Sequence, residues 1–195
     1  MATKKQAAQA KKTRIVMDDV MIDLETLDTG VTAAILSIGA CRFNETEIDG
    51  EGFYRAITIQ SNIDEHRTIS GNTLAWWVGQ GEKAKRVFAD PAAVPLGQAL
   101  DELRAWLGTP VEAKNKRVYG NGANFDISIL DHAYAAGGQT SPWEFYNVRC
   151  FRTLKSLPSA RNVPKPDNAL AHNALFDAIA QAQHLQALWA AGVGK

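Results

Sequence analysis

The chain has 195 residues, of which 46% are hydrophobic and 22% are charged, and its formal net charge is zero. This length suits one substantial core and therefore one domain. No apolar stretch is long enough to span a bilayer, and the N-terminus lacks the hydrophobic run of a secretory signal. Cys41 and Cys150 form no CxxC pair, so we expect two reduced thiols in an intracellular, cytoplasmic protein.

The charges are distributed unevenly along the chain. Five basic residues and no acid lie in the first 14 positions, namely Lys4, Lys5, Lys11, Lys12 and Arg14. We expect residues 1–16 to be a basic tail, disordered or helical, that could touch phosphates without sequence preference. Residues 17–195 then form the domain, which holds 16 basic and all 21 acidic residues. A domain of this charge needs local basic patches, stacking or bound cations to hold nucleic acid.

The predicted elements begin with three strands, over residues 19–25, 34–43 and 52–59, whose short connections favour an antiparallel meander. Helices are predicted over residues 73–78, 82–88, 95–107, 124–136 and 173–191. A short strand over residues 117–120 precedes the fourth of these helices, for which Asn124 is a candidate N-cap. The segment over residues 147–157 fits either a helix or a strand. This order predicts an α/β fold with a mixed sheet flanked by helices.

Two carboxylates, Asp23 and Glu25, project from the same face of the first strand, because side chains alternate along a strand. Met21 shares that face, and the opposite face carries Val20, Ile22 and Leu24. Unpaired acids in an apolar strand are costly to bury. A divalent cation would relieve this cost, and hard oxygen ligands suit Mg²⁺ or Mn²⁺. On this segment alone, two solvated acids at a strand end are an equally good interpretation.

Two further segments place acids near apolar helix faces. Asp126, in NGANFDISIL, shares a helical face with apolar residues at offsets of three, four and seven. It needs a partner there, unless it is a first-turn acid favoured by the helix dipole. His172 precedes the last helix, and Asp177 lies five residues further on. Taken alone, each of these residues also has an ordinary structural interpretation.

Together these residues resemble the DEDD-type 3′–5′ exonucleases of the ribonuclease H-like fold, in the subgroup with a catalytic histidine. The family's acid-x-acid pair is matched by Asp23 and Glu25, and its mid-chain Asp by Asp126. Its His-x4-Asp motif is matched by His172 and Asp177. Each motif alone is weak, but all five positions are filled in order across roughly residues 17–190. The resemblance implies a ribonuclease H-like sheet, an antiparallel meander followed by parallel strands.

A narrower resemblance is to the branch that contains exonuclease VIII, phage exonucleases and a bacterial 3′–5′ exoribonuclease. It rests on the tandem Trp76 and Trp77 in TLAWW and on the segment RCFRTL, although the branch often has an acid where this chain has Cys150. The resemblance implies a bacterial or phage origin and, for a phage-encoded protein, a location in the host cytoplasm. It is compatible with a homodimer, and we expect no membrane among the partners.

The resemblance also implies hydrolysis by two Mg²⁺ or Mn²⁺ ions, which activate water and stabilise the leaving group. Asp23, Glu25 and Asp177 would hold the water-activating ion. Asp23 would bridge to the second ion, to which Asp126 would contribute directly or through water. His172 would take the proton from the water, because an imidazole titrates near neutrality. The product would be a nucleoside 5′-monophosphate.

The expected substrate is a 3′ end of DNA or RNA, preferably single-stranded. By resemblance, Thr26 and Leu27 lie near the terminal nucleotide, although Leu27 fits a core role equally well. Adjacent helical residues point about 100° apart, so one of the tandem tryptophans should pack in the core and the other should touch substrate. We predict the substrate contact for Trp77, with core packing as the alternative for this residue. The other predicted contacts are Asn124 and Arg152, with a solvated basic face as the alternative for Arg152.

Three other functions stay open at this point. A catalytically idle nucleic-acid-binding module on the same fold would be favoured by loss of one of the five motif residues, and none is lost. A polymerase-associated proofreading subunit would share the chemistry and differ in its partner. A hydrolase with a single zinc ion would need more His or Cys ligands near the motifs.

Overall fold

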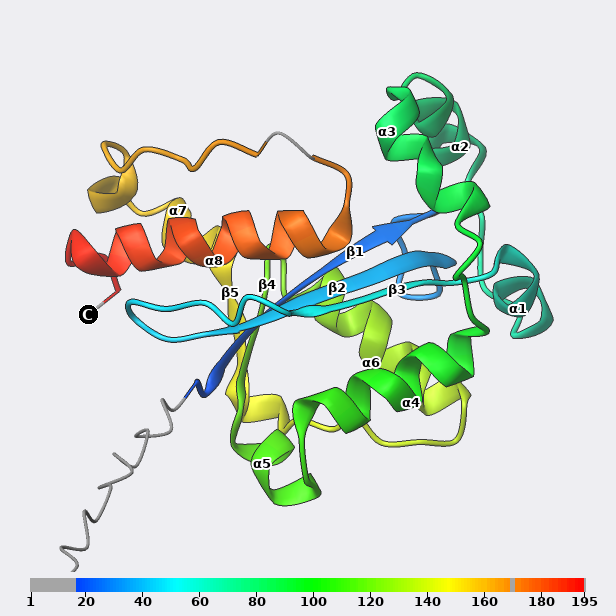
Figure 1. Ribbon diagram of the computed structural model, residues 1–195, viewed down its shortest axis with the longest axis horizontal. Helices are drawn as coiled ribbons and strands as arrows, with labels where there is room; N and C mark the ends of the chain where they lie inside the picture. Colours follow the sequence, from blue (N-terminus) through cyan, green and yellow to red (C-terminus); the bar gives the residue numbers. More distant parts are fainter. Residues whose placement is uncertain (1–16, 169–170, 195) are drawn as a thin grey trace, which may run out of the picture.

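A five-stranded mixed sheet in the order β3-β2-β1-β4-β5 forms the middle layer of the fold (Figure 1). The computed structural model describes residues 17–168 and 171–194, so the predicted basic tail lies outside the described residues. The first three strands pair antiparallel, whereas β1 pairs parallel with β4 and β4 with β5. The strands are β1 (Asp19–Thr26), β2 (Ile35–Phe43), β3 (Phe53–Ala56), β4 (Arg117–Gly120) and β5 (Val148–Cys150). The predicted meander followed by parallel strands is confirmed.

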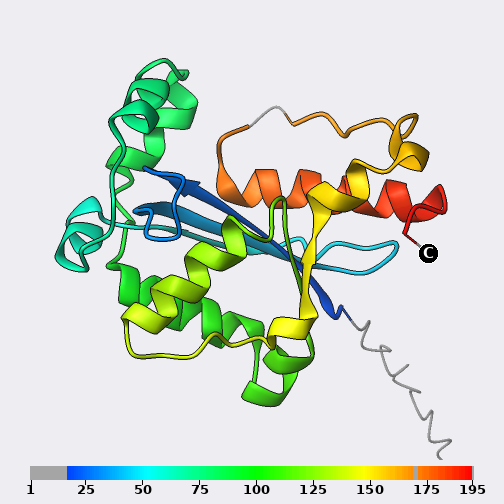
Figure 2. The same cartoon turned by 180° about the vertical axis from the view of Figure 1, so that it is seen from behind.

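Helices cover both faces of this sheet (Figure 1; Figure 2). One face is covered by α4 (Leu96–Leu107) and α6 (Asp126–Ala136), and the other by α7 (Phe151–Lys155) and α8 (Ala174–Ala190). A lobe near the end of β1 consists of α2 (Gly71–Val78), α3 (Glu82–Lys85) and η1 (Arg86–Ala89). The remaining helical segments are α1 (Ile59–Asp64), α5 (Pro110–Asn115), η2 (Phe145–Asn147) and η3 (Pro158–Ala160).

The central strand β1 packs against both helical layers. Val20, Ile22 and Leu24 belong to the core cluster that α4 and α6 complete. Met21 belongs to the second cluster, with Ala178 and other residues of α8. The predicted separation of the two faces is therefore confirmed, and it follows from the alternation of side chains along the strand. The face that carries Met21 also carries Asp23 and Glu25, and so it looks toward α8.

Gly39 of β2 lets the start of α8 approach the sheet closely. A methyl group built on Gly39 would lie 2.0 Å from the carbonyl carbon of Ala174 and 2.1 Å from the backbone nitrogen of Leu175. Any side chain at position 39 would therefore displace the first turn of α8. Because Gly39 is paired with Asp23 of β1, this contact brings the start of α8 over the acidic half of β1.

Several helix boundaries differ from the expectation. α6 begins at Asp126 with Phe125 as its N-cap and no side-chain cap, so the prediction of Asn124 as the cap is wrong. The predicted helix over residues 82–88 is divided into α3 and η1, and residues 147–157 contain β5 followed by α7. α1 was not predicted, because a helix of six residues has too little periodicity, and Asn62 holds it to the backbone of Ile35.

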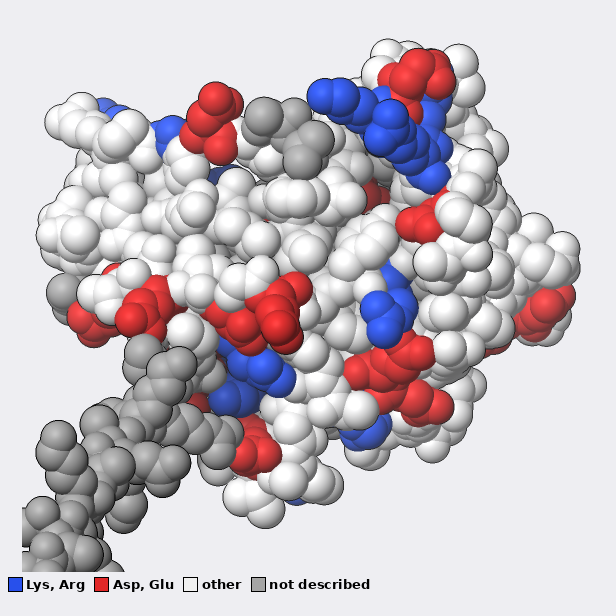
Figure 3. Space-filling model, viewed as in Figure 1, with Lys and Arg blue, Asp and Glu red and all other residues white. Residues whose placement is uncertain are grey.

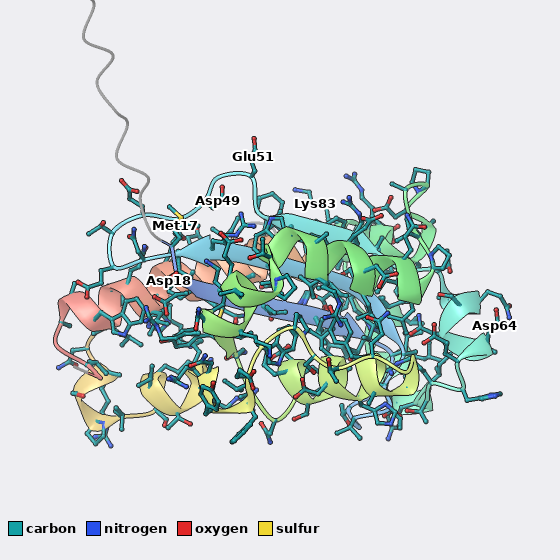
Figure 4. All side chains as sticks on the ribbon, turned by 90° about the horizontal axis from the view of Figure 1, so that it is seen from below. Met17, Asp18, Asp49, Glu51, Asp64 and Lys83 are labelled. Atoms are coloured by element: carbon teal, nitrogen blue, oxygen red, sulfur yellow. The ribbon has the colours of Figure 1, made fainter. Side chains whose placement is uncertain are left out.

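The described chain begins at the end of the molecule away from α1. Met17 and Asp18 lie at one end and Asp64 of α1 at the other, and side chains fill the space between the sheet and its helices (Figure 4). Because Asp23 and Glu25 lie in the second half of β1, the chain enters β1 at the end away from these acids. Among the described residues, no helix is both long and apolar enough to cross a bilayer.

Candidate active site

Three predicted carboxylates meet between β1 and the first turn of α8. Asp23, Glu25 and Asp177 each place one carboxylate oxygen so that all three oxygens lie within 4.8 Å of one another. Asp23 and Glu25 come from the same face of β1, and Asp177 lies in the first turn of the helix that packs on that face. Residues more than 150 positions apart in the sequence thus form one cluster of hard oxygen donors.

The backbone around His172 orients the carboxylate of Asp177. The backbone N–H of His172 donates to Asp177 Oδ2 at 2.8 Å, and Asn168 Nδ2 donates to Asp177 Oδ1 at 2.8 Å. His172 has a φ of 67°, in the left-handed region that is uncommon for residues other than glycine. Asn173 caps α8 by accepting from the N–H groups of Leu175 and Phe176. The turn before α8 therefore positions both His172 and Asp177.

Asp126 lies beside β1 at the point where the pairing of β1 with β4 ends. The last paired residues are Ile22 and Gly120, and the next exposed N–H group on that edge, from Leu24, donates to Asp126 Oδ1 at 3.3 Å. Gly122 N donates to the other oxygen, Oδ2, at 3.2 Å. Asp126 is 2% exposed, so its predicted position on the buried face of α6 is confirmed. Two backbone donors thus hold a buried carboxylate next to Asp23.

Burial raises the pKa of all four acids, and repulsion by neighbouring acids raises the pKa of Asp23 and Glu25 further. Burial is the largest cause in each case, and it raises the pKa of Glu25 to about 8 and that of Asp126 to about 6. The pKa of Asp23 is raised well above its usual value by burial and then by the charges of Asp126, Glu25 and Asp177. Burial also raises the pKa of Asp177. Among the described lysines and arginines, none forms an ion pair with these acids.

This donor set fits a hard divalent cation. Carboxylate oxygens are the ligands that Mg²⁺ and Mn²⁺ prefer. The cluster contains no sulfur or imidazole donor that would favour zinc. A cation would also remove the cost of keeping several negative charges together in a partly buried site. The residues present therefore fit the predicted Mg²⁺ or Mn²⁺, which Asp23, Glu25 and Asp177 would hold with Asp126 adjacent.

Gln181 is a residue of the site that the sequence analysis missed. Its Nε2 donates to Asp23 Oδ1 at 2.7 Å, and its Oε1 is buried without a hydrogen-bond partner. The only signal in the sequence was its position four residues after Asp177, on the same side of a helix. A neutral amide can orient Asp23 without competing with a metal ion for its charge. Lysine or arginine at this position would neutralise the carboxylate instead.

The tandem tryptophans differ in exposure, although both line the same cleft as Glu25 and Thr26. The contact of Trp77 with substrate stays a prediction. Trp77 is 2% exposed, and its Nε1 donates to the carbonyl oxygen of Thr26 at 2.9 Å. Trp76 is 46% exposed. Leu27 is 1% exposed and packs with Trp77, so its core role is the one observed. The prediction that one tryptophan of the pair packs in the core is therefore confirmed, and that residue is Trp77.

The ring of His172 packs against both tryptophans. Its centroid lies 5.1 Å from that of Trp76 and 6.4 Å from that of Trp77, in edge-on geometry. Trp76 also lines a cleft of about 380 Å³, together with Glu25 and Thr26. Thr26 is buried, and its hydroxyl donates to the carbonyl oxygen of Asp28 at 2.7 Å. Of the predicted contacts, Thr26 therefore lines a cleft beside the carboxylates.

Asn124 and Arg152 lie against the loop that precedes α6. A methyl group built on Gly122 would come within 3.2 Å of Asn124 Oδ1 and 3.4 Å of Arg152 Nη2. The same glycine donates its N–H to Asp126, so both side chains lie near the fourth carboxylate. A second cavity, of about 510 Å³, lies on the other side of His172 and is lined by Lys83, Arg86 and Phe176 among others. Figure 3 shows basic side chains over the α3 region beside this cavity.

The raised pKa values predict how the metal-free protein responds to pH. A carboxyl with a raised pKa binds its proton more tightly in the folded chain, so its stabilising contribution is complete below its ordinary pKa of about 4 and is lost as pH rises through the folded value. Without divalent metal, we therefore expect the Tm to fall between pH 5 and pH 8, across the folded pKa values of about 6 for Asp126 and about 8 for Glu25. Thermal melts over this range measure the effect.

Glu25→Gln should raise the metal-free Tm at pH 8 and reduce the increase that Mn²⁺ produces, because it removes one of the repelling charges. Glu45→Gln is the matched control, since Glu45 is exposed. If Glu25→Gln and Glu45→Gln shift the Tm equally, the repulsion within the cluster does not limit stability.

Gln181→Leu should weaken metal binding while the fold persists. Partners that orient a metal-binding side chain typically contribute about 10–100-fold to metal affinity. We expect a rise of this size in the Mn²⁺ dissociation constant measured by titration calorimetry. Gln183→Leu, at an exposed position of the same helix, should leave the constant unchanged. Equal constants for the two variants would show that Gln181 does not orient Asp23.

Residues 18–189 match the family described as the 3′–5′ exoribonuclease Rv2179c-like domain. No curated protein matches the chain. The fold is similar to the crystal structure of cell-death related nuclease 4 (CRN-4), with a TM-score of 0.54 and 14% identity over 91% of this chain and 65% of that chain. It is also similar to a crystal structure of a full-length 3′-exonuclease, with a TM-score of 0.52 and 16% identity over 91% of this chain and 84% of that chain.

The two solved structures confirm the ribonuclease H-like fold class. The family match covers most of the described residues, including all four acids and His172. The match to the family confirms the prediction of an exonuclease, whereas the histidine subgroup and the narrower branch stay predictions. The chain belongs to the 3′–5′ exoribonuclease Rv2179c-like domain family, and it is a hydrolytic 3′–5′ exonuclease.

Proposed function

We propose that this exonuclease cleaves the terminal phosphodiester with two divalent metal ions and a histidine general base. The observation that carries the proposal is the cluster of Asp23, Glu25 and Asp177, whose carboxylate oxygens lie within 4.8 Å of one another, with Asp126 fixed beside it. When bound, the ions supply the positive charge that activates water and stabilises the leaving oxygen. The chain's own residues hold the ions, the proton and the substrate.

Three of the four acids are held in place by neutral hydrogen-bond donors. Gln181 orients Asp23, the N–H groups of Leu24 and Gly122 orient Asp126, and His172 and Asn168 orient Asp177. Carboxylates fixed in advance need little rearrangement when charge develops on the phosphate oxygens. The protein thus contributes a rigid, negatively charged frame for the cations.

His172 is the residue that would accept the proton of the attacking water. Its backbone N–H donates to Asp177 Oδ2, so His172 is held directly beside one carboxylate of the cluster. The ring contacts Trp76 and Trp77, which limit where it can move. A general base of this kind contributes about 10²–10⁴-fold to the rate.

The terminal nucleotide would lie in the cleft of about 380 Å³ that Glu25, Thr26 and Trp76 line. Trp76 offers an exposed ring on which a base can stack, and stacking is independent of sequence because every base has an aromatic face. This arrangement suits a single-stranded 3′ end. RNA is the first substrate to test, because the family is described as an exoribonuclease domain.

Wild-type protein should shorten a 5′-labelled single-stranded oligonucleotide from its 3′ end only when Mg²⁺ or Mn²⁺ is present. Asp23→Ala should abolish this activity, whereas Asp64→Ala, at the exposed end of the molecule, should not. His172→Asn should slow turnover by about 10²–10⁴-fold. Asparagine is the better substitution here, because it tolerates the positive φ of His172. His66→Asn, which has a φ of 56°, is the matched control.

Full activity in excess chelator, or in Asp23→Ala, would contradict the metal mechanism. Equal rates for His172→Asn and His66→Asn would contradict the general-base role alone. A gel of labelled RNA and DNA in parallel lanes also identifies the preferred substrate.

The two tryptophans should separate substrate binding from stability. Trp76→Ala should raise the KM for a single-stranded end, because stacking contributes about 1–3 kcal/mol per base, and should change the Tm little. Trp77→Ala should destabilise the fold by about 3–5 kcal/mol, the usual cost of removing a core tryptophan. Steady-state kinetics and chemical denaturation of both variants measure these effects. A KM that is unchanged in Trp76→Ala would rule out stacking by this residue.

A further inference from the structure

Two basic side chains, Arg152 and Lys155, lie beside the loop that leads to Asp126, and a third, Lys165, lies near Lys155. Arg152 belongs to α7, and its backbone N–H donates to the carbonyl oxygen of Asn121 at 2.9 Å. Lys155, one turn later, donates from Nζ to Asn121 Oδ1 at 2.7 Å. The loop that they contact continues into Gly122, whose N–H holds Asp126. Lys165 acts electrostatically on Lys155 from the segment after η3. We call Arg152, Lys155 and Lys165 the α7 cationic surface.

Within residues 17–168 and 171–194, the side chains of this surface form no direct ion pair with an acid, although the charge of Arg152 lowers the pKa of the nearby Asp126. Lys155 is only partly exposed, and its pKa is lowered by burial and by the charges of Arg152 and Lys165. The same lysines, after burial, lower the pKa of the neighbouring His184. Like charges held together in this way favour the binding of an anion.

A nearby arginine shows what a structural role looks like in the same region. Arg149 donates from Nη1 to the carbonyl oxygens of Tyr146 and Val148, at 2.7 and 3.0 Å. Its guanidinium is therefore used to hold the turn before β5. Arg152 donates its backbone N–H to Asn121, but no side-chain hydrogen bond of its guanidinium is found within the described part of the chain. The guanidinium of Arg152 is left for a ligand.

The geometry of the cleavage reaction indicates which part of the substrate lies over this surface. In an in-line displacement, the attacking water and the leaving 3′ oxygen lie on opposite sides of the phosphorus. His172 marks the side of the water, and Asp126 with the α7 cationic surface lies on the other. Figure 2 shows α7 on one side of the start of α8 and the lobe of α2 and α3 on the other. The rest of the strand begins at the leaving oxygen and therefore runs toward α7.

We propose that the α7 cationic surface binds the backbone phosphates upstream of the scissile one and so holds the strand that remains after each cleavage. This inference rests on the proposed function, and it adds the direction in which the strand leaves the site. It also explains how a domain with an excess of acids can hold a polyanion, because the favourable charge is concentrated where the strand passes.

The test compares a dinucleotide, which has only the scissile phosphate, with an octanucleotide, which has upstream phosphates as well. Lys155→Gln should raise the KM for release of the first nucleotide from the octanucleotide by roughly tenfold, the usual size of one charge-assisted hydrogen bond. The KM for the dinucleotide should not change. Lys165→Gln should act in the same direction, and because Lys165 is exposed this variant keeps its fold.

Lys83→Gln is the matched control. Lys83 is an exposed lysine that lines the cavity on the His172 side, so its loss should leave both KM values unchanged. In addition, an octanucleotide with one uncharged methylphosphonate at the second linkage from its 3′ end should bind the wild-type protein more weakly than the unmodified octanucleotide. Lys155→Gln should not weaken the binding of this modified octanucleotide further. The slope of log KM against log salt should fall by about 0.7 for each cation removed from the surface.

The outcomes distinguish the inference from the proposed function. If Lys155→Gln changes the KM of both substrates equally, or if Lys83→Gln has the larger effect on the octanucleotide, the strand does not run over α7 and the inference is overturned while the exonuclease remains. If wild-type protein with Mn²⁺ releases nucleotides from neither substrate, the proposed function fails and the inference fails with it.

Discussion

The mutual repulsion of four carboxylates at the end of β1 is the constraint on which the rest of the site depends. Both faces of β1 are buried, so acids placed there lose hydration and raise one another's pKa. The apolar clusters on the two sides of the sheet stabilise the fold against this cost. Active sites commonly retain such destabilising groups because function requires them. Here a divalent cation bound by the cluster would relieve the repulsion.

The groups that hold these acids share one property, which is that they are neutral. Backbone N–H groups hold Asp126 and Asp177, and the amides of Gln181 and Asn168 hold Asp23 and Asp177. A lysine or arginine among them would have stabilised the empty site and weakened the bound metal. The basic residues of the region lie instead at its margins, near α3 and in α7, and we propose that those of α7 bind phosphates.

The carboxylates therefore divide the cleft into two functionally different sides. On one side, His172 packs on Trp76, next to the cleft that Glu25 and Thr26 line. On the other, Asp126 leads into the loop that Arg152 and Lys155 contact. This polarity follows from the close approach of α8 at Gly39 and from the strand order, which places β4 and β5 on the same side of β1. The loop that leads from β4 to α6 and the start of α7 after β5 therefore lie on that side, although the two helices cover opposite faces of the sheet. The fold thus sets the position of the carboxylates, and with it the direction that we propose for the strand.

The sequence by itself determined the features that depend on local periodicity. Alternation along β1 places Asp23 and Glu25 on one face, and helical spacing places Asp126 on a buried face, because both are properties of a few consecutive residues. The order of the family motifs identified His172 and Asp177 as residues of the site. Only the tertiary structure decided which of Trp76 and Trp77 is exposed, that Gln181 binds Asp23, and that Arg152 and Lys165 come close to Lys155. These depend on which segments pack together across more than a hundred residues, and neither the side of a helix that faces a distant strand nor the partner of a buried amide is encoded in local spacing.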